Sequence, residues 1–221
     1  RAAFYAKRNG KDRIQVYEGG INEESQDKET GYEQVAPTVY ALVAAIDAKD
    51  SFTFQHSTNV SQYAVLLAQK LGLSRNDIQT VKVAGLLHDI GKIGIPESIL
   101  KKAGKLTNEE YEIMKSHVEK SIEMIHYLPN MNYVIPAVVS HHERYDGKGY
   151  PRGIKGEEIP FLGRILAVCD SFDAMISKRA YKEPLSVEYA MGELEKNKGT
   201  QFDPEVADAF IELIKEGKVP L

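Results

Sequence analysis

Residues 88–96 read HDIGKIGIP and mark the point where an expected helix ends. The apolar face of that helix carries Val81 and Ala84 and reaches His88. Neighbouring residues on a helix diverge by about 100 degrees, so His88 and Asp89 can point to one centre only where the helix stops. The Ile-Gly-Lys that follows Asp89 is typical of such a stop, and the stretch therefore predicts a helical protein with a ligand pair at a helix end.

Further histidines stand on inward faces or at ends of other expected helices. His56 precedes Val60 by four residues and shares its apolar face, so it points inward. A helix beginning near Pro136 runs to a second adjacent pair, His141 and His142. His117 lies at the edge of an apolar stripe from Tyr111 to Ile125, on one helix expected after the capping box of Thr107 and Glu110. Asp170 lies on a helix expected over residues 161–177. With His88 and Asp89, the candidate metal ligands are His56, His117, His141, His142 and Asp170.

Five histidines and two aspartates in these positions indicate a metal centre. One inward histidine is more often a core residue than a ligand, but seven nitrogen and oxygen donors together are too many for one tetrahedral zinc ion. They suit two ions bridged by a carboxylate. The lack of cysteine among the ligands disfavours a structural zinc site and leaves iron, manganese, zinc and nickel open.

Composition limits the class of protein. The 221 residues suit one principal domain, and the formal net charge of −4 argues against a broad surface for duplex nucleic acid, so a small phosphoester is the favoured anionic ligand. No apolar run approaches the about 20 residues that span a bilayer, and no signal peptide is visible. The one cysteine, Cys169, suits a reducing compartment and predicts a cytoplasmic location. The chain opens on Arg1, so we expect a fragment with a membrane or sensory segment upstream.

The chain changes character along its first fifty residues. Residues 1–20 combine a basic helical end, a turn and an alternating strand, and residues 21–36 are polar and acidic without an apolar period. Helical patterning begins at Val39. We therefore expect an N-terminal remnant, a linker over residues 21–36 and one helical domain over residues 37–221, with its last two helices starting at Ser186 and Asp203.

The motifs carry a resemblance to a known family. His56, His88-Asp89 and Asp170 resemble the HD superfamily of metal-dependent phosphohydrolases. HDIGKIGIP, HHERYDGKGYP (141–151) and DSFDAM (170–175) resemble, more narrowly, the HD-GYP family, over roughly residues 48–210. The resemblance implies an all-α, HD-type helical bundle around a binuclear metal site. It also implies a phosphodiesterase in which metal-activated hydroxide opens cyclic di-GMP to linear pGpG; whether hydrolysis continues to GMP is left open.

A shorter resemblance concerns the N-terminus. FYAKRNGKDRIQVYE, residues 4–18, is similar to the end of a GGDEF domain. It implies that the chain is part of a longer cyclic-dinucleotide protein and that a GGDEF domain contacts it in cis or in trans.

The resemblance also assigns roles to the ligands. It implies that His56, His88, Asp89 and Asp170 hold one ion, that Asp89, His117, His141 and His142 hold the other, and that Asp89 bridges them. Lys92 matches a lysine that steadies the phosphoryl oxygens. Its alternative role is that of a lysine interacting with a helix C-terminus.

Substrate contacts are implied at five positions. Tyr150 lies in the Gly147–Pro151 loop and can stack on or hydrogen-bond a guanine, with a plain structural turn as the alternative. Lys92, Arg179, Lys182 and Asp50 match positions that line the same cleft. Phe52 stands where some relatives have a glutamate that supports a third metal, so two ions are expected. Ser121 replaces a common glycine, a change small enough to leave the site intact.

Two alternatives to cyclic di-GMP hydrolysis remain from the sequence. One is the same chemistry on another cyclic dinucleotide such as cyclic GMP-AMP. The other is a module that senses the dinucleotide or contacts a partner without turnover. The complete ligand set speaks against the second. The sequence leaves open whether the domain forms a homodimer.

Overall fold

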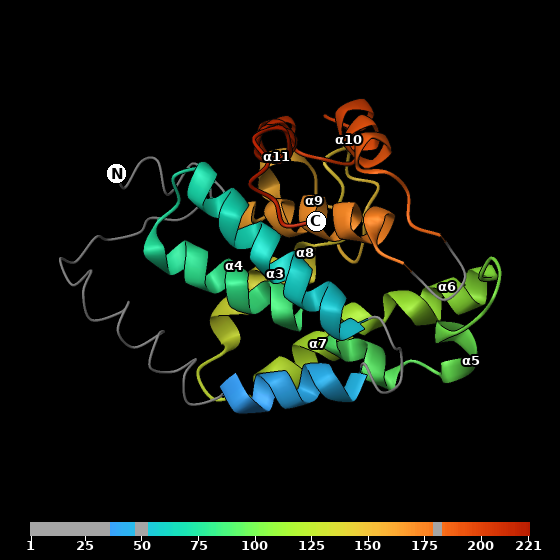
Figure 1. The fold of residues 1–221 in the computed structure, drawn as a ribbon. Helices are drawn as coiled ribbons and strands as arrows, with labels where there is room; N and C mark the ends of the chain where they lie inside the picture. Colours follow the sequence, from blue (N-terminus) through green and yellow to red (C-terminus); the bar gives the residue numbers. More distant parts are fainter. Residues whose placement is uncertain (1–35, 47–52, 179–182) are drawn as a thin grey trace.

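The computed structural model describes residues 36–46, 53–178 and 183–221, and these residues fold as helices joined by turns (Figure 1). Within these ranges no strand forms, apart from one isolated bridge between Lys198 and Phe202. The expected all-α class is therefore confirmed. The expected N-terminal remnant and nearly all of the expected linker lie outside the described residues, as do Asp50, Phe52, Arg179 and Lys182.

The element bounds agree well with the capping signals. A first helix covers residues 36–46. It is followed by α3 (Thr53–Lys70), α4 (Arg75–Leu87), η1 (Ile90–Gly94), α5 (Glu97–Leu100), α6 (Asn108–Lys115), α7 (His117–His126), η2 (Asn132–Val134), α8 (Ile135–Ser140), η3 (Gly156–Glu158), α9 (Phe161–Ile176), α10 (Val187–Lys196) and α11 (Pro204–Lys215). The side chains of Ser74, Thr107, Ser186 and Asp203 each accept a backbone N–H at a helix start, and the last three are the starts predicted above. No helix in the described parts of the chain is both long enough and apolar enough to cross a membrane.

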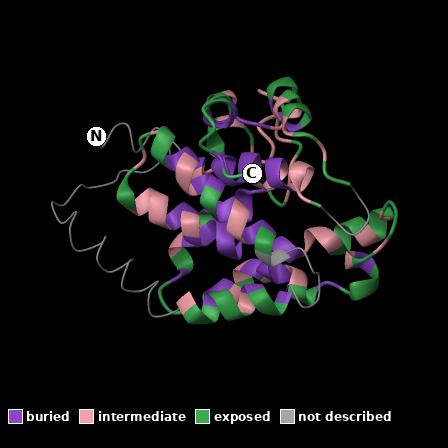
Figure 2. Ribbon diagram, viewed as in Figure 1, coloured by how far each residue is buried: buried purple, intermediate pink, exposed green. Residues whose placement is uncertain are grey.

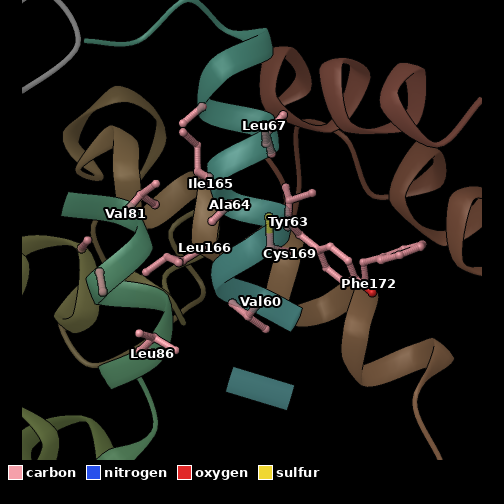
Figure 3. Packing of buried hydrophobic residues seen from close by; sticks show 14 of the residues in the cluster. Val60, Tyr63, Ala64, Leu67, Val81, Leu86, Ile165, Leu166, Cys169 and Phe172 are labelled. Atoms are coloured by element: carbon pink, nitrogen blue, oxygen red, sulfur yellow. The ribbon is translucent and has the colours of Figure 1, made fainter. Parts of the chain in front are cut away.

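Helices α3, α4 and α9 enclose the centre of the core. Figure 3 shows buried side chains of all three helices in this region: Val60 and Leu67 of α3, Val81 and Leu86 of α4, and Leu166 of α9. Burial of such side chains contributes about 1.5–3 kcal/mol each relative to exposure. The buried parts of these helices form the interior seen in Figure 2.

An aromatic cluster joins the C-terminal helix to this core. The ring of Phe172 on α9 lies 5.8 Å from Tyr63 of α3 and 5.1 Å from Phe210 of α11, both edge to face. The Tyr63 hydroxyl donates to the Pro220 carbonyl at 3.0 Å. Helix α9 is thus held between α3 and α11, which fixes the position of Asp170.

One expected element is wrong in its extent. The apolar stripe after Thr107 predicted a single helix through Ile125, but the structure divides it at Ser116 into α6 and α7. The Ser116 hydroxyl donates to the Ile113 carbonyl at 2.6 Å, and the ring of His117 pairs with the Met114 carbonyl at 2.8 Å. These side chains compete with backbone amides for the last carbonyls of α6, which ends the helix. Helix α6 then leaves the bundle, as Figure 1 shows.

Candidate metal centre

The structure brings all seven predicted ligands into two adjoining groups. Within each group, one ligand atom from every member lies within 4.8 Å of the others. The first group comes from α3, the end of α4 and α9, and the second from the end of α4, the start of α7 and the end of α8. Their members are His56, His88 and Asp170 in the first, and Asp89, His117, His141 and His142 in the second.

Three of the histidines are oriented by the helix ends on which they stand. Nδ1 of His88 lies 2.7 Å from the Gly85 carbonyl, Nδ1 of His117 lies 2.8 Å from that of Met114, and Nδ1 of His141 lies 2.5 Å from that of Val138. Each carbonyl belongs to the last turn of a helix, where backbone acceptors lack an amide partner. Since a carbonyl only accepts, Nδ1 must carry the proton. The lone pair of each ring is therefore on Nε2, the form in which imidazole binds a metal.

His56 is oriented by a carboxylate instead. Its Nδ1 lies 2.7 Å from Oδ2 of Asp173, which is fully buried on α9. Asn59 and Ser177 also donate to this carboxylate, at 2.8 and 3.0 Å. Sequence reasoning did not assign a role to Asp173, although its position one turn after Asp170 on the same helix face was the available signal.

The buried polar atoms without hydrogen-bond partners fit a metal site. Buried polar atoms are nearly always paired, so a cluster of unpaired ones requires an explanation. Among the described residues, five such atoms converge within the two ligand groups, and each is a ligand atom suited to a divalent transition metal. They are Nε2 of His56, His88, His117 and His141, and Oδ1 of Asp89.

The carboxylate of Asp89 faces both groups. Its Oδ1 lies 3.3 Å from Nε2 of His117, while Oδ2 lies 3.3 Å from Nε2 of His88 and 3.8 Å from Nε2 of His56. Asp170 completes the first group, with Oδ1 at 3.1 Å from Nε2 of His56. One carboxylate with an oxygen toward each group has the shape required of a bridge between two ions.

Charges in the centre suit cations. Burial alone would raise the pKa of Asp89, but Lys92 and His88 hold that pKa well below its usual value. Burial lowers the pKa of His141 well below the usual imidazole value and that of His142 to about 4. The carboxylate is therefore charged and these imidazoles are neutral, which is the state that binds metal.

His56 differs from the other imidazoles. Burial lowers its pKa, but the adjacent carboxylates of Asp170 and Asp173 outweigh this and raise the pKa to about 9. The excess negative charge around His56 thus attracts a positive charge, whether a proton or a metal ion.

Lys92 and Ser121 complete the environment of the HD pair. Lys92 Nζ lies 2.5 Å from Oδ2 of Asp89. The Ser121 hydroxyl accepts from the amide of Gly91 at 2.9 Å and donates to the His88 carbonyl at 3.0 Å. Serine at this position therefore ties η1 to α7 and is compatible with the site, as predicted.

Tyr150 lies beside the second ligand group. Its ring centroid is 4.7 Å from that of His142, and its amide donates to the His142 carbonyl at 3.2 Å. Buried Glu143 accepts from the amides of Arg152 and Gly153 at 2.7 and 3.2 Å and so holds the loop. Sequence reasoning quoted Glu143 within a motif without giving it a role.

Of the other positions considered in the sequence, one is described by the structure and three are not. Cys169 is buried, and burial raises the pKa of its thiol well above the usual value, so it is a core residue. Asp50, Arg179 and Lys182 lie outside the described residues, and their expected substrate contacts stay predictions.

Comparison with known sequences gives one family and a set of relatives. The profile of the HD domain matches residues 41–206. A cyclic di-GMP phosphodiesterase of Thermotoga maritima is 44% identical over 170 residues, which are 76% of this chain and 46% of that protein. The 3'3'-cGAMP-specific phosphodiesterase 2 of Vibrio cholerae is 39% identical over 176 residues, covering 79% of this chain and 34% of the relative. The chain thus spans less than half the length of these curated relatives.

Comparison with solved structures supports the fold. Bd1817, a HDG"Y"P protein from Bdellovibrio bacteriovorus, superposes with a TM-score of 0.63 at 19% identity, covering 88% of this chain and 66% of that one. At this identity the likeness concerns the arrangement of helices alone.

Proposed function

The chain belongs to the HD domain family, and on this premise we propose that it is a metal-dependent phosphodiesterase that opens cyclic di-GMP to linear pGpG. The observation that carries the proposal is the convergence of unpaired imidazole Nε2 atoms on the two oxygens of Asp89. The relative from Thermotoga maritima, named a cyclic di-GMP phosphodiesterase, supports this substrate.

The proposed ligand roles follow the two groups. His56, His88 and Asp170 hold one ion, His117, His141 and His142 hold the other, and Asp89 bridges them. Two such ions, when bound, activate water and stabilise the charge of the phosphodiester. Iron or manganese is the proposed metal, which elemental analysis of protein purified without oxygen would identify.

Lys92 is proposed to act on the substrate phosphate. Its Nζ is anchored on Oδ2 of Asp89, and its side chain is 20% exposed, so the amine stands between the buried centre and solvent. A fixed cation there stabilises the negative charge that increases on the phosphoryl oxygens. The alternative role, in which Lys92 only interacts with a helix C-terminus, does not explain why its amine contacts the carboxylate of a metal ligand.

The test compares wild-type protein with Asp89→Ala. Each is loaded with ferrous iron or manganese without oxygen and incubated with cyclic di-GMP, and the products are separated by chromatography. We expect pGpG or GMP from the wild type and none from Asp89→Ala. Asp208→Ala is the matched control, because Asp208 lies on α11 in an exposed ion pair with Lys198, and its loss should leave turnover unchanged. Wild-type protein that holds two metals and yields no product contradicts the proposal.

3'3'-cGAMP is the second candidate substrate. A relative named as specific for 3'3'-cGAMP is 39% identical to this chain. Incubation with equal amounts of both dinucleotides measures the preference directly. Binding of either one without product would instead indicate the non-catalytic sensor.

The organisation of the longer protein is also a proposal. We propose that residues 1–20 are the end of a GGDEF domain and that residues 21–36 link it to the helical domain. A longer form of the protein with diguanylate cyclase activity would support this assignment.

A further inference from the structure

A row of aromatic rings leads outward from the second ligand group. The His141 and His142 rings lie 4.0 Å apart, the Tyr150 ring lies 4.7 Å from His142, and the Tyr111 ring lies 6.3 Å from Tyr150. The first ring is buried, whereas Tyr111 is 47% exposed. The row therefore connects the metal centre to the molecular surface.

The inner part of this row is rigidly placed. Gly149, directly before Tyr150, approaches the backbone so closely that an added Cβ would lie 2.3 Å from the Arg144 nitrogen and 2.5 Å from the His142 oxygen. The Tyr150 amide bonds the His142 carbonyl. Burial also raises the pKa of the Tyr150 phenol, so the ring is uncharged at neutral pH. Tyr150 is thus a fixed, neutral aromatic surface at the edge of the site.

The outer part of the row stands on a helix that contributes little to the core. None of the residues of α6 is buried, and Figure 2 shows this helix in the colours of intermediate and exposed residues. Tyr111 and Lys115 are four residues apart and so share one face of α6. The Lys115 amine lies 5.3 Å from the centroid of Tyr111 and 5.7 Å from that of Tyr150, which shows that this face is directed toward Tyr150.

We propose that Tyr111 and Lys115, together with Tyr150, form an outer subsite for the substrate. The two tyrosine rings bind a purine base, and the Lys115 amine interacts with the negatively charged sugar-phosphate backbone. This rests on the proposed function. An exposed ring beside a fixed ring offers a stacking surface for a base, and the amine offers a cation near the anionic backbone. A cyclic dinucleotide with one phosphodiester at the metal centre extends beyond it, and the row of rings lies along such a path.

A structural role for Tyr111 predicts different behaviour. If Tyr111 only packed against Tyr150, its loss would lower stability and affect every substrate alike. A base-binding role instead affects substrates that carry a purine. The two roles are therefore separated by the chemistry of the substrate.

The experiment measures KM and kcat for cyclic di-GMP and for bis(p-nitrophenyl) phosphate, a phosphodiester without a purine. For Tyr111→Ala and Tyr111→Leu we expect the KM for cyclic di-GMP to rise about 5- to 100-fold, with a several-fold smaller change for the other substrate. Tyr111→Phe keeps the aromatic face and should stay near the wild type. An unchanged KM for cyclic di-GMP in Tyr111→Ala, or an equal change for both substrates, overturns the proposal.

The matched control is Tyr127→Ala. Tyr127 is 88% exposed and caps the C-terminal end of α7, opposite the end that carries His117. We expect wild-type kinetics on both substrates. A rise in KM equal to that of Tyr111→Ala would mean that loss of any exposed tyrosine has this effect and would overturn the assignment.

Lys115 provides an independent measurement. Lys115→Met retains the apolar stem and removes the charge, so the KM for cyclic di-GMP should rise and become less dependent on salt concentration. Lys101→Met is its control, because both lysines pair with a nearby glutamate, Lys101 with Glu97 and Lys115 with Glu112, whereas only the Lys115 amine also lies over Tyr111 and Tyr150. An unaltered salt dependence in Lys115→Met contradicts the part assigned to the charge.

Failure of the proposed function has a separate signature. Metal-loaded wild-type protein would then hydrolyse bis(p-nitrophenyl) phosphate and leave cyclic di-GMP intact. In that case the subsite is tested by equilibrium binding of GMP. Weaker binding by Tyr111→Ala supports the subsite, and equal binding overturns it.

Discussion

Four imidazoles direct Nε2 into the metal centre and form a hydrogen bond through Nδ1, but the acceptors are of two kinds. His88, His117 and His141 use backbone carbonyls, which no side-chain substitution removes. His56 depends on the side chain of Asp173, which is 117 residues away in the sequence. Of these four histidines, His56 is thus the one whose orientation a single side-chain substitution can change.

Asp173→Ala should therefore weaken metal binding selectively. Loss of such an outer carboxylate typically lowers metal affinity about 10- to 100-fold. At limiting metal, the metal content should fall from two ions per chain toward one, as elemental analysis after dialysis would measure. Asp173→Asn keeps an oxygen that can accept from Nδ1 and should lose less. A metal content equal to the wild type in both variants would contradict the role given to Asp173.

At the scale of the element, helix starts were more predictable than helix interruptions. Thr107 and Asp203 cap helices through contacts within three residues, and such local chemistry can be recognised in the sequence. The break at Ser116 could not be recognised, because the apolar stripe continues across it and the competing hydroxyl and imidazole bonds depend on how α7 packs. The metal ligands were predicted from their residue types and helix positions, whereas Asp173 was not, because its bond to His56 spans 117 residues of sequence.

The 3-10 helix η1 packs so closely against α7 that adding one methyl group at Gly91 should disturb the contact. A Cβ on Gly91 would lie 2.0 Å from the His117 carbonyl oxygen and 2.5 Å from the Ser121 nitrogen, both backbone atoms. Gly91→Ala must therefore push η1 away from α7 and separate Asp89 from His117. We expect a loss of stability of about 1–3 kcal/mol in thermal or urea unfolding and reduced metal content.

Gly192→Ala is the matched control for that substitution. Gly192 lies inside α10 with nothing within 4 Å of the added Cβ. Because alanine favours helices over glycine by about 1 kcal/mol, this variant should be somewhat more stable than the wild type and keep both metals. Wild-type metal content and stability in Gly91→Ala would show that η1 can shift freely.

At the scale of the whole molecule, the core and the metal centre share helix α9. Cys169 is completely buried and faces α3 (Figure 3), while its neighbour Asp170 belongs to the first ligand group. The one thiol of the chain therefore reports whether α9 is in place. Since burial also raises its pKa, the folded protein holds the thiol protonated and inaccessible.

Native protein should accordingly resist modification by a thiol reagent such as 5,5'-dithiobis(2-nitrobenzoate). Complete reaction is expected only in denaturant, with a midpoint equal to that of unfolding followed by circular dichroism. Metal-loaded and metal-free protein can be compared in the same assay, and slower labelling of the loaded form is expected because ligand binding to the native state stabilises it. Rapid stoichiometric labelling without denaturant would contradict the observed burial.

The histidines that end α4 and α8 have a consequence for variation in chain length. Inserting one residue within either helix would turn His88 or His141 by about 100 degrees and advance it by about 1.5 Å, so the ring could no longer reach the same centre. An insertion in the turn between α5 and α6 changes no such relation, since the described ligands all lie outside it. The metal centre therefore constrains the number of residues in the helices that carry its ligands. Turns that carry no ligand can vary in length without moving the centre. Gaps between homologous sequences should accumulate in those connections and be rare within α4 and α8.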